Sequence, residues 1–186
     1  MARGMSLESA TKLAFIAGCC YVQKKHNSPL SPGELLSFIG CKMVECPEVL
    51  KRRNYKLAFA NGCFDLGLTA PHIELLKHAK SKADKLVVAI NSDQSVAKLK
   101  GSSRPIVPAE ERAKILMGLS SVDYVVIFDE ETPLEVIKKI MPDLIIKGGD
   151  YTKDTVVGNE LVEVEIFNSI KGMSTTDKIK KILSSH

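Results

Sequence analysis

The feature that most constrains the fold is a regular alternation that begins at residue 56, where short apolar segments alternate with longer amphipathic ones. The apolar segments predict strands, and the amphipathic segments predict helices. Uninterrupted apolar strands are typical of a parallel sheet covered on both faces. The sequence therefore predicts a doubly wound, Rossmann-like α/β fold with a five-stranded parallel sheet. The expected strands are 56–60, 86–90, 124–128, 143–147 and 162–167, and the expected helices are about 72–82, 108–119, 133–141 and 174–184.

Residues 1–55 do not share this alternation. Ser6 is a plausible N-cap, and apolar residues at helical spacing follow it. The Ser31-Pro32 pair reads as the start of a second helix. We expect a helical appendage at 1–55 beside a main domain at 56–186. Its apolar faces would pack on that domain or on a partner subunit, so a homodimer is possible.

Composition excludes several classes of function. The 186 residues carry 26 Lys and Arg against 22 Asp and Glu, and they contain no Trp. The lysines are scattered rather than gathered into a basic stripe with aromatics, which argues against a nucleic-acid partner. No apolar run is long enough for a membrane span. The apolar segment 13–20 lacks the flanks of a signal peptide, so we expect a cytoplasmic protein.

Cysteine usage gives no clear metal signal. The five cysteines are odd in number and form no C-x-x-C pair. We expect buried, reduced thiols, with a structural zinc in the N-terminal region as the less favoured alternative.

The strongest local signal for function is a strand, a glycine turn and a helix between residues 56 and 80. This order places backbone N–H groups and a helix start at the end of a strand, a geometry that binds phosphate. His72 stands at the helix start, where its imidazole could reach a phosphoryl oxygen; the alternative is a simple cap or surface residue. Neither a Walker loop nor G-x-G-x-x-G is present. The turn residues predicted to bind nucleotide are Asn61, Gly62, Cys63, Phe64 and Asp65.

Polar residues also follow other predicted strands. Asn91 and Asp93 follow the second strand, and Gly148-Gly149-Asp150 follows the fourth. Ligands of doubly wound sheets bind at the carboxyl ends of strands. The glycines would let the backbone approach a ligand, with a tight turn as the alternative. Asp150 would bind ribose or metal-linked phosphates, or else only cap the turn.

Hydroxyl residues open the last predicted helix. Ser174, Thr175 and Thr176 are N-cap candidates, and the same N–H groups can hold phosphates. Both roles are compatible. We therefore place these three residues among the candidate nucleotide-binding groups.

Together these motifs resemble a known family. Thr69-Ala70-Pro71-His72 resembles the (His/Thr)-x-Gly-His signature of the cytidylyltransferase-like nucleotidyltransferases. Later motifs make the chain, over about residues 56–184, similar to the adenylyltransferase domain of bacterial heptose-phosphate enzymes, which make ADP-heptose for lipopolysaccharide. These motifs are Asn91-Ser92-Asp93, Lys98-Leu99-Lys100-Gly101, Arg104-Pro105-Ile106, Lys147-Gly148-Gly149-Asp150-Tyr151 and Gly172-Met173-Ser174-Thr175-Thr176.

The resemblance implies roles for particular side chains. His72 would contact the triphosphate, and Thr69 would donate a hydroxyl hydrogen bond nearby. One of Lys98 and Lys100, which we place in a glycine-containing loop, would approach the phosphates, and the choice between them is open.

Other site candidates are less closely defined. Asn91, Asp93 and Arg104 are candidate substrate-binding residues, and Asp65 would orient His72 or help to hold a metal. Arg112 is a further basic candidate, although a surface ion pair is as good an interpretation. The chain departs from the family pattern at Pro71, which replaces glycine and has no N–H to offer a phosphate.

The leading functional prediction is a nucleotidyltransferase. It would transfer a nucleoside monophosphate from ATP to a sugar phosphate such as D-glycero-β-D-manno-heptose 1-phosphate, release pyrophosphate and require Mg²⁺. Too few residues precede the domain for a sugar kinase, so we expect a stand-alone transferase.

Two alternatives remain open. One is a cytidylyltransferase for glycerol 3-phosphate or another polyol phosphate. Residues 169–171, Ser-Ile-Lys, lack the arginine typical of that family. The other is a nucleotide-binding module without turnover, which Pro71 would favour.

Overall fold

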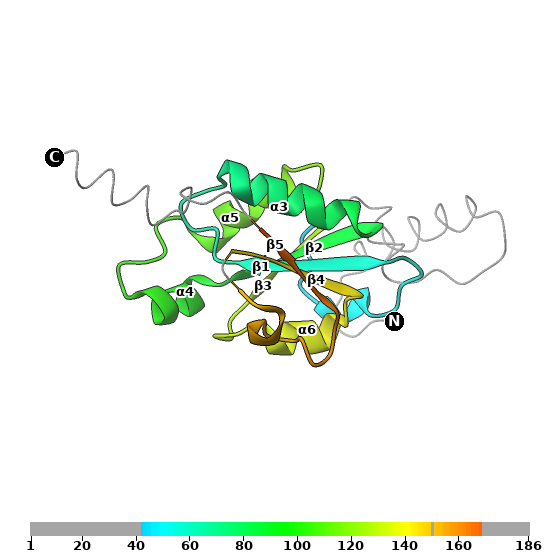
Figure 1. Cartoon of the computed structure of the whole chain (residues 1–186). Coiled ribbons are helices and arrows are strands. Elements are labelled where there is room, and N and C mark those ends of the chain that lie inside the picture. Colours follow the sequence, from blue (N-terminus) through cyan, green and yellow to red (C-terminus); the bar gives the residue numbers. More distant parts are fainter. Residues whose placement is uncertain (1–41, 150, 169–186) are drawn as a thin grey trace, which may run out of the picture.

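A five-stranded, fully parallel sheet forms the centre of the molecule in the computed structural model, which describes residues 42–149 and 151–168 (Figure 1). The strands lie in the order β3-β2-β1-β4-β5. Their bounds are β1 Leu57–Gly62, β2 Lys85–Asn91, β3 Tyr124–Phe128, β4 Leu144–Gly148 and β5 Val164–Phe167. The predicted doubly wound α/β fold is confirmed, and strand bounds differ from the expected ones by at most two residues.

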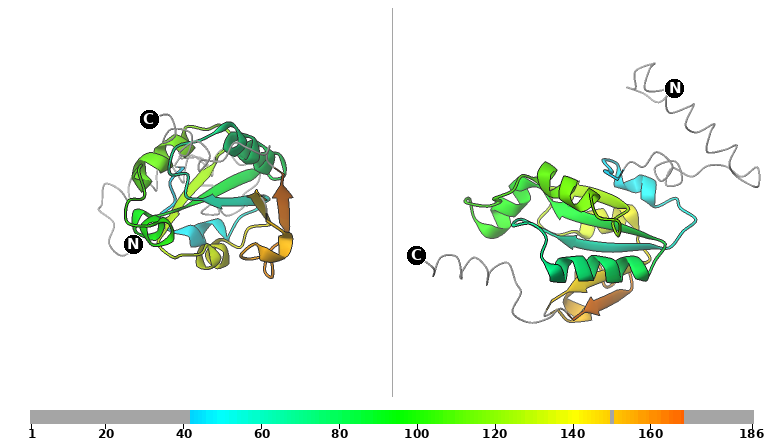
Figure 2. Two further views of the ribbon diagram at one scale, coloured as in Figure 1. Left: turned by 60° about the vertical axis from the view of Figure 1, so that its left-hand side comes forward. Right: turned by 90° about the horizontal axis from the view of Figure 1, so that it is seen from above.

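Helices cover both faces of this sheet (Figure 2). On one face, α3 (Ala70–Ser81) and α5 (Ala109–Met117) pack on alternate strand residues such as Ala58 and Val88. On the other, α6 (Leu134–Ile140) and the 3₁₀ helix η1 (Pro47–Leu50) pack on the intervening residues, such as Phe59. A further 3₁₀ helix, η2 (Lys153–Thr155), lies between β4 and β5. Because both faces are buried, the strands read as continuous apolar runs.

The order in which successive strands are added to the sheet reverses at β1. From β1 the chain forms β2 and then β3 on one side, and β4 and β5 then add to the other side. β1 therefore pairs with β2 and with β4, both in parallel register. The carboxyl ends of β1 and β4 meet at this reversal, where doubly wound sheets place their ligands.

One expected loop is a helix. Residues 96–101 were predicted to be a glycine-containing loop, but α4 (Asp93–Lys100) carries both Lys98 and Lys100. The Ser92 hydroxyl caps it by accepting from the Ser95 N–H at 3.3 Å. Gly101 ends it with φ of +96°, a conformation that favours glycine. The prediction failed because Asn91-Ser92-Asp93 was interpreted as a ligand motif and not also as a helix start.

Residues 42–55 belong to the same core as the sheet. Met43 forms a parallel bridge to Val125, and the Val44 N–H donates to the Val125 carbonyl at 2.8 Å. Leu50 is fully buried in the core on the α6 face. The predicted border between residues 55 and 56 therefore crosses a continuous apolar core. The helices expected before residue 40 and after residue 173 lie outside the described residues.

Within the part of the chain that the structure describes, no helix has the length and apolar character needed to cross a membrane.

Leu50 tests how firmly the segment before β1 is fixed. Leu50→Ala removes a fully buried side chain, so the free energy of unfolding should fall by about 2–5 kcal/mol. Chemical denaturation of the full chain measures this. Leu161→Ala, at a position that is 45% exposed, is the control and should change stability by about 0.5 kcal/mol or less. Equal, small effects of both variants would contradict a shared core.

Candidate active site

His72 is held at the start of α3 by the residue that caps the helix. The Thr69 backbone N–H donates to His72 Nδ1 at 3.1 Å, and the Thr69 hydroxyl oxygen lies 3.0 Å from the same nitrogen. An N–H group can only donate, so Nδ1 acts as an acceptor and the ring proton is assigned to Nε2. The Phe64 ring meets the imidazole edge-on, with 5.4 Å between ring centroids. The predicted position of His72 at a helix start is confirmed, whereas its contact with Thr69 was not predicted.

Pro71 occupies the first turn of α3. There the backbone N–H groups have no partner within the helix, so proline costs no helical hydrogen bond. The turn before it contains Phe64 at φ +50° and Gly67 at φ +81°. The chain therefore enters α3 through a turn with two residues in the left-handed region of backbone conformation.

Lys147 lies at the carboxyl end of β4, beside the end of β1. Its Nζ donates to Asn61 Oδ1 at 3.0 Å and stands 5.1 Å from the centroid of the Tyr151 ring. Burial lowers the pKa of the Lys147 ammonium, and the nearby Cys63 thiol group opposes that change. Lys147 belongs to the Lys147-Gly148-Gly149-Asp150-Tyr151 motif but was not among the predicted site residues. A lysine that directly follows an apolar strand was the available signal.

Gly148 ends β4, and Gly149 directly follows it. A Cβ at Gly148 would lie 2.4 Å from Leu75 Cδ1, so glycine permits the close approach of α3 to β4. Gly149 has φ of +104°, which L-residues rarely adopt. The tight-turn interpretation thus has a structural basis, and contact of Gly148 with nucleotide stays a prediction.

Asn91 and Cys63 form a chain of side-chain contacts between β2 and the turn after β1. The Cys63 thiol donates to Asn91 Oδ1 at 3.6 Å, and Asn91 Nδ2 donates to Ser95 Oγ at 2.9 Å. Asn91 is only 4% exposed. Its amide therefore joins β2 to α4, and its predicted contact with substrate stays untested.

Arg112 is buried beneath the strand ends instead of forming a surface ion pair. Its Nη1 donates to the Cys63 carbonyl at 2.7 Å and to the Asn91 carbonyl at 2.8 Å. Its Nη2 donates to Asp93 Oδ1 at 2.7 Å, and its Nε donates to the Val107 carbonyl at 2.8 Å. Arg112 is 1% exposed. The guanidinium therefore fixes the carboxyl ends of β1 and β2 relative to each other.

Asp65 holds the segment that follows α4. Its carboxylate is fully buried, forms an ion pair with Arg104 and accepts from the Ile106 N–H at 2.6 Å and the Val107 N–H at 3.2 Å. Burial raises the pKa of this carboxyl, but the hydrogen bonds from Val107, Arg104 and Ile106 outweigh it and leave the pKa below its usual value. Asp65 and Arg104, both predicted to touch ligand, are thus paired with each other.

The remaining candidates are dispersed. Lys98 and Lys100 are exposed on α4, and the structure does not single out one of them. Asp93 accepts from Arg112 and from the Ala109 N–H at 2.8 Å. Asp150, Ser174, Thr175 and Thr176 lie outside the described residues.

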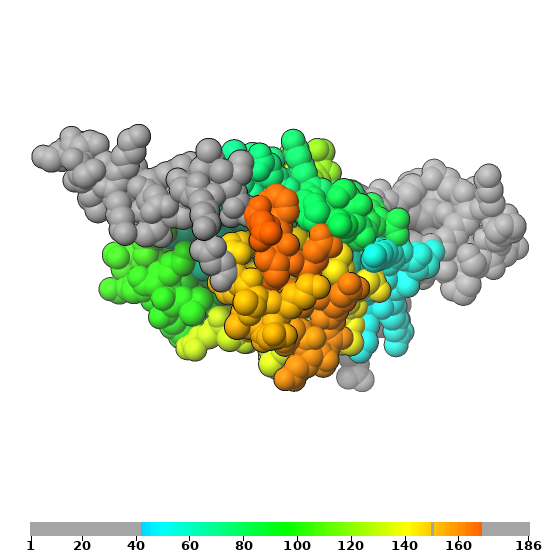
Figure 3. All heavy atoms as spheres, viewed as in Figure 1, coloured from blue at the N-terminus to red at the C-terminus, as the bar shows by residue number. Residues whose placement is uncertain are grey.

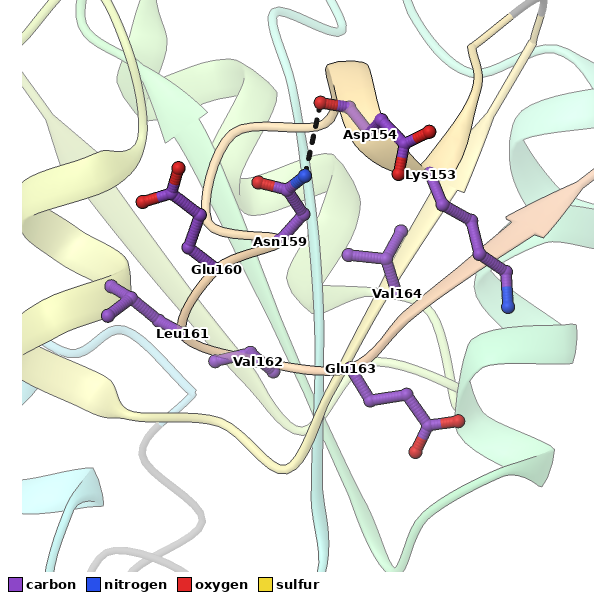
Figure 4. A pocket seen from close by; sticks show the side chains of 8 residues that line it. All are labelled: Lys153, Asp154, Asn159, Glu160, Leu161, Val162, Glu163 and Val164. Carbon is purple, nitrogen blue, oxygen red and sulfur yellow. Dashed lines mark hydrogen bonds between the residues drawn. The ribbon is translucent and has the colours of Figure 1, made fainter.

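A shallow hollow of about 430 Å³ lies elsewhere, around the start of β5 (Figure 4). Asn159 Nδ2 donates to the Asp154 carbonyl at 3.0 Å on its rim. Figure 3 shows the orange segment of this hollow apart from the green segment that contains α4. None of the predicted site residues lines it. The side chains suited to phosphate chemistry instead gather at the carboxyl ends of β1, β2 and β4.

Comparison with known proteins identifies the family of this chain. The family model described as cytidylyltransferase-like matches residues 59–185, and the chain belongs to that family. Among curated relatives, the bifunctional protein HldE of Syntrophotalea carbinolica is 41% identical over 100% of this chain, and that of Koribacter versatilis is 43% identical over 97%. The chain spans 41% of the length of each of these relatives.

Solved structures support the fold. A lipopolysaccharide core biosynthesis protein from Thermoplasma volcanium aligns with a TM-score of 0.52 at 23% identity, covering 63% of this chain and 98% of that one. Pantoate-β-alanine ligase from Francisella tularensis, in complex with β,γ-ATP and β-alanine, aligns with a TM-score of 0.51 at 14% identity, covering 76% and 78%.

Arg112 should be essential for stability. Arg112→Met leaves the buried Cys63 and Asn91 carbonyls without their donor, so we expect a loss of about 3 kcal/mol in the free energy of unfolding. Denaturant titration measures this. Arg52→Met, at an exposed arginine, is the matched control and should cost about 0.5 kcal/mol or less. A stable Arg112→Met protein would remove the guanidinium from its proposed structural role.

Asp65 should make stability depend on pH. Its folded pKa lies below the usual value of 3.8, so its ionised form stabilises the fold above that pH. This stabilisation is lost as the pH falls through the folded pKa. Asp65→Asn should therefore be less stable than the parent at neutral pH, and the difference should shrink below pH 3.8. A difference in unfolding free energy that stays constant with pH would refute this account.

Proposed function

We propose that this chain catalyses nucleotidyl transfer from ATP to a sugar phosphate, with a heptose 1-phosphate as the leading acceptor. A phosphate oxygen of the acceptor attacks the α-phosphorus of ATP, the bond from that phosphorus to the bridging oxygen breaks, and pyrophosphate leaves. Membership of the cytidylyltransferase-like family and about 40% identity to proteins named HldE support this proposal. The single observation that carries it is the oriented imidazole of His72 at a helix start beside the strand ends.

The protein's contribution would be positioning and charge stabilisation. Thr69 fixes His72 Nδ1, so Nε2–H is the donor toward a non-bridging phosphate oxygen. The positive end of the α3 dipole would favour the same anion, although Pro71 in the first turn has no N–H to donate. Lys98 or Lys100 on α4, the helix that follows β2, would add positive charge near the phosphates. His72 stays a hydrogen-bond donor in this scheme and need not transfer a proton.

Mg²⁺ is part of the proposal, and the described residues constrain how it would bind. They contain no cluster of three or more His, Cys, Asp or Glu side chains suited to a metal ion. Asp65 and Asp93 are both engaged by arginine and by backbone N–H groups. These residues do not form a protein cage for the ion. We therefore propose that Mg²⁺ enters on the triphosphate, as is usual for nucleotide sites.

The choice of nucleotide and acceptor needs a direct assay. Pyrophosphate release with ATP and CTP, each tested with heptose 1-phosphate and glycerol 3-phosphate, distinguishes the two transferase proposals. Release with ATP and the heptose phosphate alone would support the leading one. Binding of ATP without release with any acceptor would favour a module without turnover.

His72 provides the mechanistic test. His72→Ala removes the proposed donor to the transition state, so kcat should fall about a hundredfold while ATP affinity changes much less. Steady-state kinetics with separate calorimetric binding would show this. His78→Ala is the matched control, because His78 lies on the same helix but pairs with Glu165 at 2.6 Å. Unchanged turnover in His72→Ala would remove His72 from the mechanism.

A further inference from the structure

We propose that Lys147 binds a phosphate group at the junction of β1 and β4, where it acts as a substrate-binding cation that Asn61 holds in place. This inference rests on the proposed function, because it names a further group of the same site. It concerns phosphate chemistry that either the triphosphate or the sugar phosphate can supply.

The first argument is position. β4 ends at Gly148, directly after Lys147, and β1 ends at Gly62, directly after Asn61. The two side chains meet across the strand ends at the reversal of strand order. His72 and the turn after β1 belong to the same edge of the sheet. Lys147 is thus placed where a ligand of this fold would lie.

The second argument is unbalanced charge. Lys147 is partly buried, and desolvation lowers its pKa. Among the described residues its hydrogen-bond partner is a neutral amide, and no carboxylate contributes to the change in its pKa. Such an ammonium is costly to keep charged without an anion. Lys80 and Lys85 pair with Asp123, and Arg104 pairs with Asp65, while Lys42 donates to the carbonyls of Met117 and Leu119.

The third argument is orientation. An ammonium has three donors and no acceptor, and Asn61 takes one of them. The Tyr151 ring lies 5.1 Å from Nζ, which limits the directions open to the side chain. A compact ammonium held in this way can bind a phosphate oxygen without rearranging. A purely structural lysine would gain little here, because an apolar side chain would avoid the cost of burial.

The experiment compares ligands that differ only in phosphate. Lys147→Met removes the ammonium and keeps an unbranched chain, while Lys147→Arg restores the charge. Lys153→Met is the matched control on the exposed 3₁₀ helix that follows. Calorimetry measures the Kd for ATP, adenosine and pyrophosphate, and steady-state kinetics measure the KM for heptose 1-phosphate. Thermal denaturation checks folding, and Lys147→Gln repeats the comparison if the methionine variant is unstable.

If the triphosphate is the partner, Lys147→Met should weaken ATP binding about tenfold or more, leave adenosine binding unchanged and recover partly in Lys147→Arg. If the acceptor is the partner, ATP binding should stay the same and the KM for heptose 1-phosphate should rise by a similar factor. Either result supports the proposal. Unchanged values for both would overturn it, as would equal weakening of ATP and adenosine, which signals a structural role.

Failure of the proposed function has a different signature. A parent protein that binds ATP but transfers nothing would refute transfer, and the comparison of ATP with adenosine would still decide the role of Lys147. A parent that binds neither ATP nor pyrophosphate would overturn both proposals.

Discussion

The arrangement of the candidate site depends on the buried guanidinium of Arg112. Parallel strands are joined only along their lengths, and their ends are free to separate unless something ties them. Arg112 donates to the carbonyl of Cys63 after β1 and to that of Asn91 at the end of β2. Planar donors in a fixed fork suit this task better than a lysine would. Asp93 accepts from the same guanidinium and also from the Ala109 N–H. This carboxylate therefore joins the start of α4 to the start of α5.

A second constraint acts between α3 and β4. A Cβ at position 148 would lie 2.4 Å from Leu75 Cδ1, so glycine leaves room for the Leu75 side chain over the end of β4. This packing brings the start of α3, with Thr69 and His72, to the edge of the sheet where β1 and β4 end. Gly148 thus has a packing role in the structure, and its predicted contact with nucleotide stays a prediction.

Sequence patterns predicted the parts of the fold that depend on periodicity. Apolar runs gave the strands, and the start of α3 was recognisable from its turn and from His72. Local propensity could not reveal tertiary partners. In the sequence, Arg112 is an ordinary residue of a predicted helix. Nothing near it in sequence indicates that it donates to the distant carbonyls of Cys63 and Asn91. The ion pair of Asp65 was missed for the same reason, because its partner Arg104 is 39 positions away and contacts it only after folding. Lys98 and Lys100 were assigned to a loop because Ser92 lies within a ligand-like motif and also caps a helix.

The distribution of carboxylates has a consequence for chemistry. Asp65 and Asp93 lie close to the predicted site, yet arginines and backbone N–H groups already neutralise them. The other side chains of the candidate site are donors: His72 Nε2–H, the Lys147 ammonium and the exposed lysines of α4. A site whose acidic groups are occupied by the protein itself, and whose remaining groups are donors, is complementary to a polyanion. In the proposed function, the pairing of the aspartates would favour phosphate as much as the lysines and the histidine do.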